Sequence, residues 1–171
     1  AGLGLVYLQA VANLWHTAGP GHGVRRWQVA AFLGGLLLLA VALLSPLDAL
    51  AGVLFSAHMA QHVLLMMAAA PLLALGAPAH IWLWVLPVSA RRSGARWLHR
   101  RPLLRGLLHT LRSPSLVLLA SAGAMWLWHI PAWYEAALAD ETLHAFEHAA
   151  FLGSAWLFWL AVLRPRRRGL L

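Results

Sequence analysis

Long apolar stretches, separated by short polar or glycine- and proline-containing segments, make up most of this sequence. Five stretches are long enough to consider as helices: residues 2–15, 27–44, 49–75, 114–130 and 142–163. They are continuous rather than alternating and far longer than strands, and only helices and closed barrels satisfy their backbone polar groups inside a bilayer. The pattern therefore predicts an all-α protein, a polytopic transmembrane helix bundle of about five spans that forms one domain over residues 1–171.

Helix-breaking residues lie where this pattern places the ends of the spans. Glycine and proline occur at residues 19–21, 45–46, 76–78 and 131. The first stretch has about 14 residues, whereas a span needs about 20, so the chain as given is expected to begin inside a helix. A signal peptide is not expected, because no basic segment precedes this stretch.

The charged residues fall on alternate connections between the predicted spans. Arginines occupy residues 25–26, 91–112 and 164–168, and four of the five acids occupy residues 45–48 and 131–141. The positive-inside rule then predicts that the amino end is outside and the carboxyl end is cytoplasmic. This placement explains the net charge of +8 without nucleic acid.

Residues 76–113 form the longest connection and carry seven arginines among leucine and tryptophan. This composition is typical of a cytoplasmic interfacial segment that lies on anionic membrane lipids. A docking surface for a protein partner is the alternative.

Ionisable side chains inside a span are costly and mark functional sites. The third predicted span contains His58 and His62, and the fifth contains His144 and His148. Each pair is spaced i, i+4, so its two imidazoles lie on one helix face. Both pairs belong to the outer half of the predicted bundle, and His129, at the outer end of the fourth span, is expected near them.

These residue types point to a metal site. Two histidine pairs supply up to four nitrogen ligands, which suits a closed tetrahedral site or a site with one open position. The chain has no cysteine, so Met59 and Met66 are its candidate sulfur ligands. A set of histidine and methionine favours copper, especially Cu(I). Glu147, the one acid within a span, is expected to orient an imidazole, bind the metal or act as a base.

Three other interpretations remain open. Residues 144–148 read H-x-x-E-H, the pattern of inverted zinc peptidases, which would make Glu147 the base of an intramembrane zinc-dependent hydrolase. One histidine from each pair could instead ligate a b-type haem for electron transfer. The histidines could also serve only to hydrogen-bond neighbouring helices.

Two blocks of the sequence resemble a known family. The first comprises residues 45–48 (SPLD), 54–66 (LFSAHMAQHVLLM), 70–73 (APLL) and 75–78 (LGAP). The second comprises residues 126–131 (WLWHIP), 134–138 (YEAAL) and 144–152 (HAFEHAAFL). Together they resemble, over roughly residues 27–163, the signature of the CtaG-type cytochrome c oxidase assembly factors of bacteria.

The resemblance implies a multi-pass protein of the bacterial cytoplasmic (inner) membrane that helps to mature a haem-copper oxidase by delivering copper, and it does not imply turnover chemistry. On the leading hypothesis, the histidine cluster accepts Cu(I) from an extracytoplasmic donor and passes it to cytochrome c oxidase subunits. The residues in the family's histidine-bearing motifs are His58, His62, His129, His144 and His148, with Met59 and Glu147 beside them. Family members generally continue through about two more spans, so this chain is expected to be a short homologue or part of a longer protein. A second copy could cover a polar face of so short a bundle, which makes a homodimer conceivable.

Overall fold

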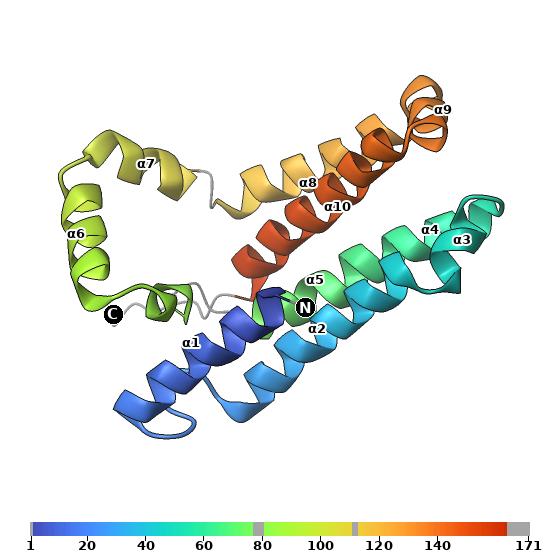
Figure 1. The fold of residues 1–171 in the computed structure, drawn as a ribbon. Helices are drawn as coiled ribbons and strands as arrows, with labels where there is room; N and C mark the ends of the chain where they lie inside the picture. Colours follow the sequence, from blue (N-terminus) through green and yellow to red (C-terminus); the bar gives the residue numbers. More distant parts are fainter. Residues whose placement is uncertain (1, 77–80, 111–112, 164–171) are drawn as a thin grey trace, which may run out of the picture.

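The computed structural model describes residues 2–76, 81–110 and 113–163, and these residues are helical apart from short connections (Figure 1). The elements are α1 (Gly2–Ala18), α2 (Arg26–Leu44), α3 (Pro46–Ala51), α4 (Phe55–Val63), the π-helical η1 (Leu64–Ala69), α5 (Ala70–Gly76), the 3-10 helix η2 (Ile81–Val85), α6 (Val88–His99), α7 (Pro102–Thr110), α8 (Pro114–Trp128), α9 (Pro131–Ala139) and α10 (Glu141–Val162). The all-α prediction is confirmed.

Three helical segments of the described chain are long and apolar enough to cross a membrane: α2, the continuous α4–η1–α5 segment Phe55–Gly76, and α10. They correspond to the second, third and fifth predicted spans. α8 and α9 pass the same test together but are bent by 73°, so the count is three spans, or four if this bent pair is one span. α1 has 17 residues and falls short of the length required.

Two predicted spans have different bounds in the structure. The stretch expected from residue 49 is interrupted, because α3 ends at Ala51 and the next helix begins only at Phe55. The stretch expected to end at residue 130 instead turns sharply after Trp128. Pro131 opens α9 at this turn, where its missing N–H costs nothing.

The π-helical segment in the third span has a local cause. Pro71 has no N–H and its ring crowds the preceding turn, which disrupts the regular pattern of hydrogen bonds. The Ala70 N–H bonds to the carbonyl of Leu65, five residues earlier, so the carbonyl of Met66 is left without its usual backbone donor. The indole Nε1 of Trp159 donates to that oxygen at 2.9 Å, which ties α10 to the middle of this span.

Replacing Trp159 by Phe removes this donor while keeping an aromatic ring. We expect the free energy of unfolding to fall by about 1–3 kcal/mol, the usual cost of an unsatisfied buried carbonyl. Denaturant titration in detergent measures the change, and Trp126→Phe, at a side chain that is 77% exposed, is the control. Equal stability of the two variants would contradict this role of Trp159.

Glycine allows α2 and α5 to approach closely. A Cβ atom on Gly76 would overlap the backbone of Gln28 and Phe32 in α2. The end of α5 is also capped by side chains, because Tyr7 Oη donates to the Gly76 carbonyl at 2.6 Å and Gln28 Nε2 donates to the Leu75 carbonyl at 3.1 Å. These bonds satisfy carbonyls that a helix end leaves without partners.

Charge separates the two ends of the bundle. In Figure 1, α3, α9 and the first turns of α10 lie at one end, and these elements carry Asp48, Glu135 and Glu141. The start of α2 and the α6–α7 segment lie at the other end, and they carry arginines. The bundle is therefore polarised as the alternating connections predict.

Candidate metal centre

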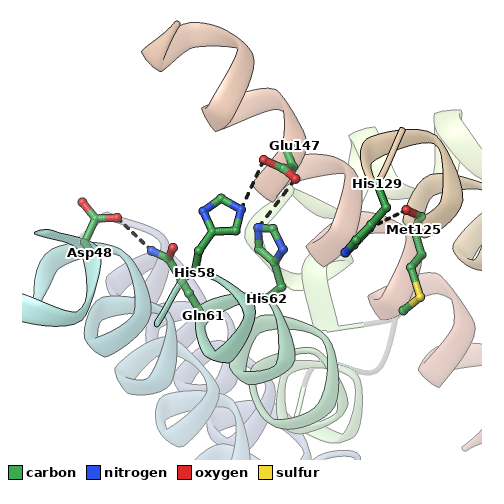
Figure 2. A network of polar contacts seen from close by, with 7 residues as sticks. All are labelled: Asp48, His58, Gln61, His62, Met125, His129 and Glu147. Carbon is green, nitrogen blue, oxygen red and sulfur yellow. Dashed lines mark hydrogen bonds and ion pairs between the residues drawn. The ribbon is translucent and has the colours of Figure 1, made fainter. Parts of the chain in front are cut away.

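The site is formed where α4 meets α10, near the acid-bearing end of the bundle. The Asp140 carboxylate accepts hydrogen bonds from Thr142 N–H at 2.7 Å and Leu143 N–H at 2.9 Å, which fixes the first turn of α10. His144, Glu147 and His148 follow within the next two turns. α4 presents His58 and His62 toward them (Figure 2 shows both residues with Glu147).

Four side chains place ligand atoms close enough to hold one metal ion. One ring nitrogen each of His58, His62 and His144 and one carboxylate oxygen of Glu147 all lie within 4.8 Å of one another. We call these four residues the His/Glu group. His58 Nε2 lies 3.9 Å from Glu147 Oε2, and His62 Nε2 lies 3.8 Å from Glu147 Oε1 (Figure 2).

These separations fit a shared ion better than direct hydrogen bonds. Donor and acceptor atoms 3.8–3.9 Å apart are beyond the hydrogen-bond range. Two ligand atoms that each lie about 2.0–2.2 Å from one ion at a tetrahedral angle are separated by roughly 3.3–3.6 Å. Small inward movements of the side chains would therefore complete a coordination sphere.

The ligand atoms are buried and have no hydrogen-bond partner among the described residues. They are both ring nitrogens of His58 and His62, both carboxylate oxygens of Glu147, and Nε2 of His144 and His148. Burying polar atoms without partners costs free energy, and native proteins rarely leave several together. A bound cation would satisfy one nitrogen each of His58, His62 and His144 and a carboxylate oxygen of Glu147, so these residues fit a metal.

The imidazoles of the two predicted pairs form one compact cluster. Ring centroids are 4.3 Å apart for His58 and His62, and 4.3 Å apart for His144 and His148. Between helices, His58 stacks on His144 at 5.2 Å and His62 meets His148 edge-on at 5.3 Å. His148 thus lies directly beside the His/Glu group, although its ligand atoms are outside the 4.8 Å set.

The other predicted site residues lie around this cluster. His129 is exposed at the end of α8, outside the His/Glu group, and its Nδ1 lies 2.7 Å from the carbonyl oxygen of Met125. Met59 is half-buried on α4. Met66 is buried in an apolar cluster with Ala70, Trp128, Ala137, Phe151 and Ala155.

Gln61 is a residue whose role the sequence reasoning missed. Its side chain is fully buried, and Nε2 donates to the Ala42 carbonyl at 2.7 Å and to Asp48 Oδ1 at 2.8 Å (Figure 2 shows the Asp48 contact). These bonds fix α4 against the end of α2 and against α3, and so orient His58 and His62 on either side of Gln61. A polar amide in an apolar span was the available signal.

Fold and site together define a class: an all-helical protein with three or four helices able to span a membrane and a buried His/Glu group able to hold a metal ion. The family model described as cytochrome c oxidase caa3 assembly factor (Caa3_CtaG) matches residues 5–170, so the chain belongs to that family. Comparison with curated proteins and with solved structures gave no match.

Proposed function

We propose that this protein binds copper in the His/Glu group and delivers it during assembly of a cytochrome c oxidase. The observation that carries the proposal is a group of buried candidate ligand atoms, on two helices far apart in the sequence, that have no hydrogen-bond partner within the described part of the chain. Membership of an oxidase assembly family supports the direction of delivery. In this role the protein carries metal and catalyses no reaction.

Copper rather than zinc follows from the family and not from the ligands alone. Imidazole and carboxylate ligands suit both metals, and affinity for divalent copper exceeds that for zinc at a given site. A haem-copper oxidase requires copper, so an assembly factor with a metal site has copper as its natural cargo. His58, His62, His144 and Glu147 would hold the ion, and His148 would be an additional nitrogen beside it.

The arrangement of Glu147 is less favourable for the zinc hydrolase. In that mechanism both histidines of H-x-x-E-H bind the metal, and the glutamate remains free to activate water. Here the Glu147 carboxylate lies between His58 and His62 within the His/Glu group, whereas His148 lies outside it. This arrangement favours a role for Glu147 as a ligand rather than as a base.

The same proposal includes an orientation in the bacterial inner membrane. The acid-bearing end and the metal site would face the extracytoplasmic side, where a copper donor can reach them. The α6–α7 segment would lie on anionic lipids of the cytoplasmic surface, because α6 carries Arg91, Arg92 and Arg96 and buries none of its side chains.

The absence of native cysteine allows this orientation to be tested with single cysteines. Glu135→Cys on α9 and Ala95→Cys on α6 replace exposed side chains. In intact cells a membrane-impermeant thiol reagent is expected to label Glu135→Cys at once and Ala95→Cys only after permeabilisation. The reverse labelling pattern would overturn the orientation.

The function is tested by the metal content of the detergent-purified protein, measured by mass spectrometry before and after loading with Cu(I) under reducing conditions. We expect about one copper per chain and no Soret band in the visible spectrum. Zinc retained in preference to copper would favour the hydrolase, and a Soret band would favour a haem protein. A protein that binds no metal would refute the proposal and leave the histidines as helix contacts.

A further inference from the structure

One ring nitrogen of His129 is engaged in a hydrogen bond, and the other is available to bind a metal ion. Its Nδ1 lies 2.7 Å from the Met125 carbonyl oxygen. A carbonyl only accepts hydrogen bonds, so Nδ1 must carry the proton and donate. In the neutral ring, Nε2 then keeps its lone pair, which is the form of imidazole that binds a metal.

The available nitrogen is directed toward the metal site. In Figure 2 the His129 nitrogen remote from Met125 points to the side where His62 lies. The fully buried Phe151 ring contacts both residues: its centroid is 4.5 Å from that of His62 and 6.1 Å from that of His129. The exposed imidazole of His129 and the buried imidazole of His62 therefore pack against the same aromatic ring.

We propose that His129 is the exchange ligand through which copper enters and leaves the His/Glu group, and that the Phe151 ring, which contacts both His129 and His62, restricts this exchange. The inference rests on the proposed copper function. A buried ion leaves most readily when an incoming ligand replaces a departing one, because the ion is then never left without ligands in an apolar setting. His129 can supply that ligand next to His62 without belonging to the resting site.

The experiment distinguishes a residue that is needed for copper transfer from one that is needed to keep copper bound. The full-length protein in detergent is loaded with Cu(I), and transfer to a coloured Cu(I) chelator is followed by stopped-flow absorbance. His129→Gln is expected to retain the wild-type copper content but to transfer it at least tenfold more slowly. His129→Met is expected to restore most of the rate, because a thioether is a soft ligand for Cu(I). His16→Gln, at an exposed histidine on α1, is the matched control.

Phe151→Leu provides a second measurement, because a smaller side chain leaves more room beside His62 and His129 for the ion to move between them. It should transfer copper at least threefold faster than the wild type at the same copper content. An unchanged or slower rate would overturn the role of the Phe151 ring.

Three results would overturn the role of His129. A wild-type transfer rate in His129→Gln would show that the ion takes another route. Loss of copper from His129→Gln at equilibrium would make His129 a permanent ligand instead of an exchange ligand. A wild-type protein that binds no copper would refute the proposed function and this inference together, whereas the first two results leave the proposed function standing.

Discussion

His62→Ala is expected to weaken copper binding by at least a hundredfold, so that the purified variant retains almost no copper. The Nε2 atom of His62 lies 3.8 Å from the Glu147 carboxylate, and its ring contacts those of both His58 and His148. Loss of an outer residue that merely orients a ligand already costs about 10–100-fold in affinity, and His62 is placed as a ligand itself. Competition with a Cu(I) chelator of known affinity measures the change.

Two further variants make this prediction specific. His16→Ala, far from the site on α1, is expected to bind copper as the wild type does. His148→Ala is expected to lose only about tenfold, because His148 lies beside the His/Glu group rather than in it. Each variant must keep the wild-type helical circular dichroism. Full copper retention by a folded His62→Ala protein would refute this site.

Gly76→Ala is expected to destabilise the fold by about 3 kcal/mol or more, although it adds a single methyl group. The new Cβ would overlap backbone atoms of Gln28 and Phe32, which cannot move away as a flexible side chain can. The shift needed to relieve the overlap would also strain the hydrogen bond from Tyr7 Oη to the Gly76 carbonyl. Denaturant titration in detergent measures the loss, with a reduced yield of monodisperse protein on size exclusion as a second sign.

Gly153→Ala is the matched control on α10, because no atom of the residues that the structure describes lies within 4 Å of the Cβ position there. An alanine inside a helix is favoured over glycine by up to about 1 kcal/mol, so this variant should be at least as stable as the wild type. Equal stability of Gly76→Ala and Gly153→Ala would mean that α2 and α5 do not pack as closely as described.

Local pattern was sufficient to predict much of this architecture. Hydropathy alone places α2 and α10 to within one residue of their observed bounds. The i, i+4 spacing of His58 with His62, and of His144 with His148, depends only on helix geometry, and both pairs are predicted in the outer half of the bundle. The separation of arginines from acids likewise follows from the order of the connections.

Features that depend on contacts between distant segments could not be predicted in this way. Whether Glu147 or His148 lies closer to His58 and His62 depends on how α10 is rotated against α4, and spacing within one helix does not fix that rotation. In the sequence, Pro131 indicates that a helix ends near this position, but it does not indicate the angle between α8 and α9. The hydrogen bonds of Gln61 join it to residues in two earlier helices.

The π-helical segment also changes the direction in which the later residues of the third span face. Gly76 follows His58 by 18 positions, which in an uninterrupted α-helix is about five full turns and would place both on one face. A π-helix turns less per residue, and the six residues Leu64–Ala69 rotate everything after them by roughly a quarter-turn or more. One continuous helix can thus direct its histidines at α10 and its close-packing glycine at α2. The part of the span that carries the candidate metal ligands and the part that packs against α2 are therefore free to change their sequences independently.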